Sequence, residues 1–170
     1  VFSKNIKYGN MHSLKSKSQI LVSRLDFDFR IEFENSEEGV TATVTTTGHN
    51  PTLIRPLEKK DKLMFISTSG VKQPFDFIYD SEKTTIKGRA AYVNTLQLNM
   101  KAIRWIASES ISSIRVVNMV QMKMYPYSLD ASRRLELRNI LRCFLDELDE
   151  TKVKDKEITS TLRTVREETT

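Results

Sequence analysis

The clearest pattern in the chain is a strict alternation of apolar and charged residues between positions 25 and 34. Leu25, Phe27, Phe29, Ile31 and Phe33 lie on one side of an extended segment, and charged residues lie on the other. The NSEEG segment that follows, at residues 35–39, has the length of a hairpin connection and ends in glycine. Residues 40–47 alternate Val and Ala with Thr, which predicts a second strand with one buried face.

Shorter patterns of the same kind continue along the chain. The segments that we predict to be strands are residues 62–68, 75–79, 90–98 and 111–117. Apolar residues at helical spacing predict a helix of two turns over residues 100–108. Residues 120–124 alternate again, so we predict a strand that pairs with residues 111–117 through a tight connection at residues 118–119. Pro126 is expected to close this strand.

The longest periodic segment lies at residues 130–150. One face of a helix there would gather five large apolar residues, Leu137, Ile140, Leu141, Phe144 and Leu148. Asp130 is a suitable N-cap, because its carboxylate can accept a hydrogen bond from a first-turn N–H. Cys143, the single cysteine, is expected on the inner side of this helix as a small core residue.

The order of these elements predicts an α+β fold with a mostly antiparallel sheet, which can bend into a partial sandwich. One long C-terminal helix and one short helix are expected to cover its hydrophobic face. The predicted core contains Phe27, Phe29, Phe33, Val44, Phe65 and Met122. We expect a single domain at residues 20–150, after a basic arm rich in Ser and Lys at residues 1–19. Residues 151–170 form a charge-balanced tail, either a marginal helix or disordered.

Residues 92–148 carry a resemblance to known proteins. They join a strand, a short helix, the strand ISSIRVV, the aromatic segment YPY and the helix with RNILRCFLDEL. This block resembles the C-terminal portion of small uncharacterised bacterial β-rich α+β proteins, in which a strand with an I-R-V core follows a short helix. The resemblance covers about a third of the chain. It implies the same fold class and brings no activity or functional residue with it.

Positive charge is concentrated at the N-terminus. The net charge is +5, and residues 1–24 carry all of it without one acidic residue. A basic arm with interleaved aromatic residues is typical of nucleic-acid or other polyanion binding. The alternative is a solvated extension. The candidate cations of this arm are Lys4, Lys7, Lys15, Lys17 and Arg24.

A second set of cations, Arg134, Arg138 and Arg142, runs along one flank of the long helix at intervals of four residues. It is either an anion-binding ridge or, as is usual for amphipathic helices, a solvated flank. We favour the solvated flank, in which Arg142 and Asp146 form an ion pair one helical turn apart.

Four carboxylates share the polar face of the first predicted strand. Side chains two residues apart on a strand lie about 7 Å from each other, which suits an acid/base pair or a hard cation. Arg30 lies among them, and a solvated strand face would carry charges anyway, so we assign no metal site. The weak candidates are Asp26, Asp28, Glu32 and Glu34. His12, His49 and Cys143 fall in different elements and lack the spacing of a transition-metal site.

No phosphate-binding loop or nucleophile elbow occurs in the sequence, so we predict no cofactor and favour a binding protein over an enzyme. The expected function is a non-catalytic interaction or structural module that uses exposed strand edges, with a protein partner or self-association. Nucleic-acid binding through the arm is the alternative, and an enzyme on the carboxylate face is the second.

Two further expectations concern location. No run of 18 apolar residues occurs, so we predict no membrane span. The single cysteine slightly favours the cytoplasm, and export after processing stays open.

Overall fold

The structure is a computed structural model that describes residues 6–10, 13–24, 27–37, 39–50 and 54–168, with side chains for those between 14 and 149. Eleven strands and two helices occur in this part of the chain. In order they are β1 (Ile6–Asn10), β2 (Ser13–Ser16), β3 (Gln19–Ser23), β4 (Phe27–Ser36), β5 (Gly39–Gly48), β6 (Asp61–Ser67), β7 (Lys72–Asp76), β8 (Glu82–Ile86), β9 (Arg89–Gln97), α1 (Met100–Ser108), β10 (Ile111–Asn118), β11 (Lys123–Ser128) and α2 (Ala131–Glu168).

The larger sheet, sheet A, has seven strands in the order β1-β2-β4-β5-β9-β8, and β3 pairs with β4 beside β2. Its centre is the long hairpin of β4 and β5, which pairs antiparallel from Phe27 opposite Gly48 to Ser36 opposite Gly39. Gly39 has a φ of +114°, a conformation that side chains with a Cβ rarely adopt. The alternation predicted for these two strands is confirmed, with Phe29, Ile31 and Phe33 buried.

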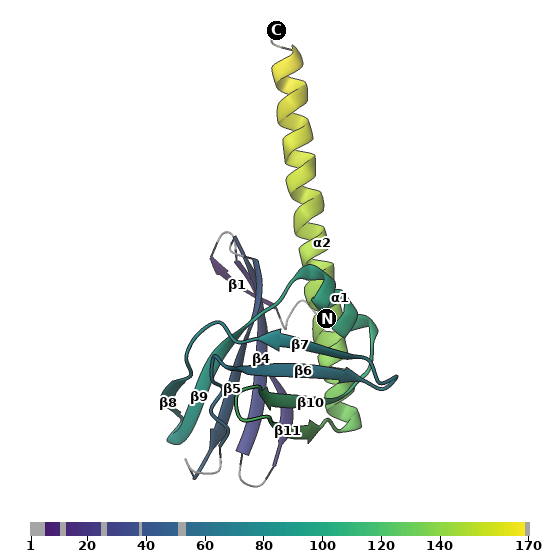
Figure 1. Ribbon diagram of the computed structural model, residues 1–170. Helices are drawn as coiled ribbons and strands as arrows, with labels where there is room; N and C mark the ends of the chain where they lie inside the picture. The colour runs from purple at the N-terminus through teal and green to yellow at the C-terminus, as the bar shows by residue number, and fades with distance from the viewer. Residues whose placement is uncertain (1–5, 11–12, 25–26, 38, 51–53, 169–170) are drawn as a thin grey trace.

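The smaller sheet, sheet B, has four antiparallel strands in the order β11-β10-β6-β7. It lies across sheet A, and the inner faces of the two sheets enclose the core (Figure 1). Rings meet across the gap between the sheets, with Phe27 and Tyr127 centroids 5.5 Å apart in an edge-on arrangement. The expected α+β fold is therefore confirmed, and its antiparallel strands form two sheets rather than one.

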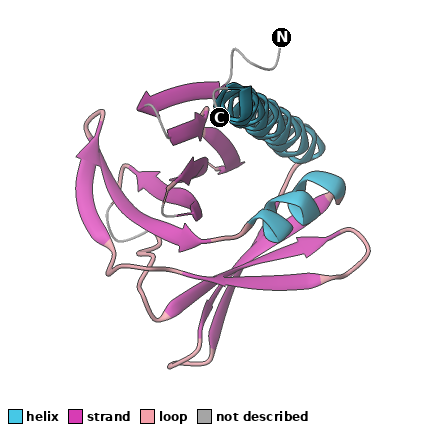
Figure 2. Cartoon of the chain, turned by 90° about the horizontal axis from the view of Figure 1, so that it is seen from above, coloured by secondary structure: helices cyan, strands magenta, loops and turns pink. Residues whose placement is uncertain are grey.

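The two helices close the open side between the sheets (Figure 2). Asn99 caps α1, because its side-chain Oδ1 accepts a hydrogen bond from the Ala102 N–H at 2.8 Å. Ile103 and Ile106 of α1 are fully buried, and α1 packs against α2. The helix predicted at residues 100–108 is confirmed.

Helix α2 fills the space beside β2 and β3 with the apolar face that the sequence predicted. All five large apolar residues of that face are buried, and the Phe144 ring lies 6.4 Å from that of Phe33 in sheet A. The carbonyl of Asp130 accepts the first helical bond, from the Arg134 N–H at 2.9 Å. The helix has 38 residues, or about 57 Å, and its C-terminal half projects beyond both sheets (Figure 1).

The hairpin between β10 and β11 differs from the prediction. Residues 119–122 form a turn instead of a strand, and β11 starts at Lys123 and runs through Pro126. Asn118 causes the turn, because its side-chain oxygen accepts hydrogen bonds from the N–H groups of Val120 and Gln121 at 3.1 and 2.9 Å. Met122 is 80% exposed, so its assignment to the core was wrong.

Four strands had no recognisable pattern in the sequence. β1 and β2 lie within the predicted arm, and β2 pairs with β4. Ser16 of β2 is fully buried, and its hydroxyl accepts a hydrogen bond from the Phe33 N–H at 2.9 Å. β3 is interrupted by a bulge, and every residue of β8 is exposed, so neither strand shows the alternation of a half-buried strand.

Candidate functional site

The outer faces of the two sheets differ sharply in chemistry. On sheet A the outward positions of β4 and β5 are all charged or hydroxyl-bearing, Asp28, Arg30, Glu32 and Glu34 opposite Thr47, Thr45, Thr43 and Thr41. This is the polar face that an antiparallel sheet ordinarily presents to water. Sheet B does not follow this rule.

Half of the outward positions of sheet B are apolar, a larger share than on sheet A. One row across the sheet is Pro74–Met64–Arg115–Pro126, and the next is Asp76–Lys62–Val117–Met124. Ile66 also belongs to this side, since it is buried but lies outside the core cluster between the sheets. We call this surface the methionine face and define it by Met64, Ile66, Pro74, Val117, Met124 and Pro126.

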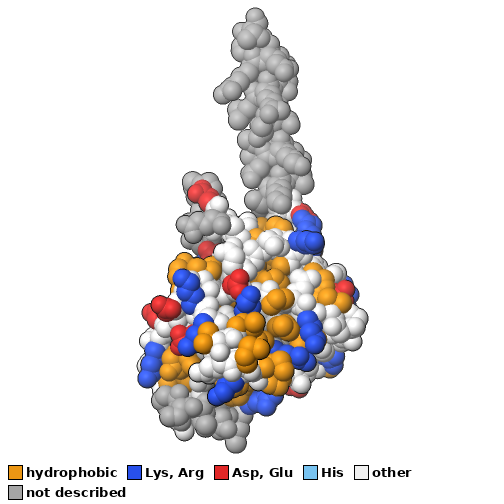
Figure 3. All heavy atoms as spheres, in the orientation of Figure 1, with side chains coloured by type: hydrophobic (Ala, Val, Ile, Leu, Met, Phe, Trp, Pro, Cys, Tyr) orange, Lys and Arg blue, Asp and Glu red, His pale blue; other side chains and the backbone are white. Residues whose placement is uncertain are grey.

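Figure 3 looks onto the methionine face and shows hydrophobic side chains gathered over sheet B, with lysine and arginine side chains around them. Met124 is 52% exposed, although its long apolar side chain would be sheltered in most folded domains. Contiguous apolar surface of this kind marks interaction sites, and methionine is common on surfaces that adapt to partners.

Arg115 lies at the centre of the methionine face. Its Nη1 donates to the Met124 sulfur at 3.6 Å, and its Nε is buried with no acceptor among the described residues. Lys62, Lys72 and Lys123 surround the face. The strands of sheet B carry two acidic side chains, of which Asp61 is buried and Asp76 is exposed. Asp76 pairs with Lys62 at 3.3 Å, and both side chains are well exposed. The apolar surface therefore has a cationic centre and rim.

The turn between β10 and β11 extends the apolar surface at one end. Met119, Val120 and Met122 are 51%, 73% and 80% exposed. Met122 also has a φ of +53°, in the left-handed region that Gly or Asn adopts at lower cost. A large apolar residue in a strained and exposed position contributes little to folding, which favours a role in recognition.

The edges of sheet B are poorly suited to pairing with another strand. Pro74 lies in the middle of the edge strand β7 and Pro126 in the middle of the edge strand β11. Proline has no N–H to donate to an added strand. At sheet A, the edge strand β8 carries Glu82 and Lys83, and charges on an edge discourage pairing. Neither edge of sheet B is therefore well suited to strand addition.

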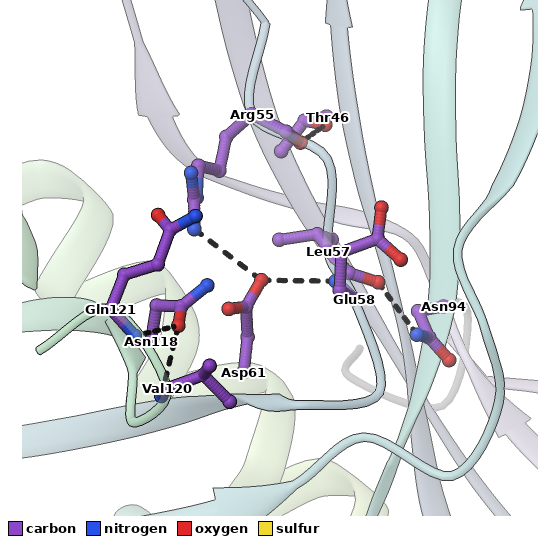
Figure 4. A network of polar contacts seen from close by, with 9 residues as sticks. All are labelled: Thr46, Arg55, Leu57, Glu58, Asp61, Asn94, Asn118, Val120 and Gln121. Carbon is purple, nitrogen blue, oxygen red and sulfur yellow. Dashed lines mark hydrogen bonds and ion pairs between the residues drawn. The ribbon is translucent and has the colours of Figure 1, made fainter. Parts of the chain in front are cut away.

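A buried polar network beneath the turn fixes the start of β6 (Figure 4). The Asp61 side chain is fully buried, and its Oδ2 accepts from the Glu58 N–H at 3.0 Å and from Arg55 Nη2 at 3.4 Å. The Arg55 guanidinium stacks on the Tyr125 ring, 3.8 Å from its centroid. These contacts join the segment before β6 to β11, so they hold the methionine face and its turn in place.

The aromatic side of β11 faces inward. Burial raises the pKa of the Tyr127 phenol above its ordinary value of 10.0, while the charges of Arg55 and Arg24 act in the opposite direction. The Arg24 guanidinium lies 5.9 Å from the Tyr127 centroid. Arg24, one of the predicted anion-binding residues, therefore contacts an aromatic ring at the junction of the two sheets.

The other cations of the predicted arm are not brought together. Lys4 and the side chain of Lys7 lie outside the described residues. Lys15 stands opposite Glu34 in the pairing of β2 with β4. Lys17 instead lines a hollow between α2 and sheet A together with Arg30 and Arg133.

The arginine ridge of α2 lies on a different flank. At 100° per residue, Arg134, Arg138 and Arg142 lie about 50–130° to one side of the buried stripe, and Arg133 lies about 50° to the other. The Nε atoms of Arg134 and Arg138 are buried without a hydrogen-bond acceptor among the described residues. The ridge and Lys17 therefore do not form one surface.

The carboxylate candidates do not converge on a metal. Asp28 accepts from the Ser23 hydroxyl at 2.8 Å and pairs with Arg89 at 3.5 Å. Asp26 lies outside the described residues. Within the described ranges, no group of three or more His, Cys, Asp or Glu side chains is placed to hold a metal ion. Cys143 is buried in the core, as predicted.

Comparisons of this chain with protein-family models, curated proteins and solved structures found no match. The resemblance of residues 92–148 to small bacterial proteins therefore stays a prediction. None of the described helices combines the length and the hydrophobicity that crossing a membrane requires.

Proposed function

We propose that this protein is a non-catalytic interaction module that binds a protein partner through the methionine face. One observation carries the proposal. Sheet B carries apolar residues on both sides, and its outer side is covered only in part, since Ile66 is buried whereas Met124 is 52% exposed. A sheet with two apolar faces ordinarily lies between two layers of secondary structure. The partner would supply the missing layer.

The charge around the face identifies the kind of partner. Two copies of this chain packed through the same face would bring Lys62, Lys72, Lys123 and Arg115 toward their own duplicates, and like charges at an interface disfavour association. An amphipathic helix with an apolar stripe and acidic flanks fits better. Its stripe would cover Met64, Val117 and Met124, and a carboxylate would meet the Arg115 guanidinium on the side of Nη1, which lies next to Met124.

A display selection tests this proposal. The immobilised protein is presented with a library of 20-residue amphipathic helical peptides that share a leucine stripe and vary in the charge of their flanks. We expect acidic peptides to be enriched, and selected peptides to bind Met124→Asp and Arg115→Gln at least about 10-fold more weakly, a loss of about 1.4 kcal/mol.

Ile86→Asp is the matched control, since it places the same charge at an exposed apolar residue of sheet A. Its affinity for the selected peptides should stay within about twofold of that of the unchanged protein, well below the 1.4 kcal/mol that a tenfold change represents. No enrichment, enrichment without a preference for acidic flanks, or equal loss in Ile86→Asp would each overturn the proposal.

A further inference from the structure

The outer face of sheet A carries two hollows that meet at shared residues. The first, of about 370 Å³, lies between α2 and β3, and the second, of about 290 Å³, lies over β4, β5 and the turn between β8 and β9. Ser18 and Arg30 line both. Small-molecule sites fall at about this size and above. We call these two adjoining hollows the sheet A groove.

The groove is basic. Lys17 and Arg133 line its first part, Lys87 and Arg89 line its second part, and Arg30 lies between them. Against these five cations the two hollows contain two acidic side chains, Glu136 and Asp28. The sequence pattern did not reveal this cluster, because its members come from four separate segments of the chain.

Both acidic side chains of the groove already have partners. Glu136 accepts a hydrogen bond from Gln19 and pairs with Arg133 at 3.3 Å. Asp28 pairs with Arg89 at 3.5 Å. These contacts orient the two arginines, whereas the cationic groups of Lys17, Arg30 and Lys87 make no hydrogen bond or ion pair with another described side chain.

The two hollows divide the cations into two groups that share Arg30. Arg30 and Asp28 are two residues apart on β4, or about 7 Å, and Arg89 lies beside Asp28. An oxyanion in each hollow would contact Arg30 from opposite sides. The guanidinium of arginine offers several N–H donors in one plane, which suits contact with phosphate oxygens.

We infer that the sheet A groove binds a small molecule that carries two phosphate groups, such as a sugar bisphosphate. Arg30 bridges the two phosphates, Lys17 and Arg133 hold one, and Lys87 and Arg89 hold the other. Ser18, Thr45 and Asn139 also line the hollows, and their hydroxyl and amide groups suit a polyhydroxylated linker.

A nucleic-acid strand is the less favoured ligand. Sites for single strands combine basic residues with aromatic rings on which the bases stack. The apolar residues that line the two hollows are Ile20, Ile86 and Ile140, and no aromatic ring lines either hollow.

The test is isothermal titration calorimetry with three probes, fructose 1,6-bisphosphate, glucose 6-phosphate and a ten-residue oligothymidylate. We expect the bisphosphate to bind at least about 10-fold more tightly than the monophosphate, and Arg30→Gln to remove that difference. Lys101→Gln removes one exposed charge from α1 and serves as the control, with affinity within about twofold.

Equal binding of the mono- and bisphosphate, or an Arg30→Gln variant that binds as well as Lys101→Gln, would overturn the inference. If the oligothymidylate bound more tightly than the bisphosphate and Arg30→Gln abolished that binding, the ligand of the groove would be nucleic acid. This result would overturn the inference as well. Because Arg30 points away from the core, thermal melting of the variant separates a lost ligand from a lost fold.

Discussion

Replacing Phe144 by alanine tests whether α2 completes the core. Phe144 is fully buried at the centre of the α2 stripe, and its ring packs 6.4 Å from that of Phe33 across the helix–sheet boundary. Transfer of the lost ring to water costs about 1.5–3 kcal/mol, and the cavity left behind raises the total to about 3–5 kcal/mol. A domain of this size has a stability of about 5–15 kcal/mol, so Phe144→Ala should remove a large part of it.

The assay is urea unfolding followed by the fluorescence of Trp105. Trp105 is the single tryptophan and packs partly buried against the same core, so its emission reports the loss of tertiary structure. The variant should also melt about 6–20 °C lower, at about 2–4 °C per kcal/mol. Leu135→Ala is the control, because Leu135 lies on the same helix and is 58% exposed. It should change the free energy of unfolding by less than about 0.5 kcal/mol.

A loss below about 1 kcal/mol for Phe144→Ala would refute the reasoning, since a cavity in a close-packed core cannot cost so little. The same outcome would follow if α2 packed loosely at the periphery.

Three further predictions concern the junction of the sheets and the turn. Asp61→Ala should lower the free energy of unfolding by about 3–5 kcal/mol, because it leaves Arg55 without its buried partner. Asp61→Asn should lower it by less, because an acceptor oxygen remains. Equal losses for the two variants in urea unfolding would contradict this. Burial raises the pKa of Tyr127, so Tyr127 ionises in the unfolded chain before it does so in the folded protein as the pH rises above about 10. The free energy of unfolding should therefore fall in that range. Between about pH 9 and about pH 11 it should fall less in Tyr127→Phe than in the unchanged protein. Met122→Asn should raise the free energy of unfolding by up to about 1 kcal/mol, because asparagine tolerates a φ of +53°; a destabilised variant would show that Met122 packs in the fold.

The sequence pattern was most informative where one side of an element is buried and the other is wet. Phe29, Ile31 and Phe33 alternate with charges, and Leu137, Leu141 and Phe144 recur at helical spacing, so both elements and their buried faces could be predicted. These regularities are local, because each follows from the geometry of one strand or one helix.

The methionine face could not be predicted, because its strands are apolar on both sides. Alternation identifies a strand in residues 111–117, but it cannot tell which apolar positions face a core. The same ambiguity placed Met122 in the core. The sheet A groove depends on pairing between distant strands, which brings Lys17, Arg30 and Arg89 together, and no local pattern encodes such a meeting.

The most direct test of the proposed function uses NMR of the protein labelled at its methionine methyl groups, titrated with a selected acidic helical peptide. The account predicts that the signals of Met64, Met122 and Met124 shift on binding, while the signal of Met100, which packs against the core at the start of α1, stays in place. A peptide that leaves the signals of Met64 and Met124 unchanged, or that shifts only that of Met100, would contradict the assignment of the methionine face as the docking surface.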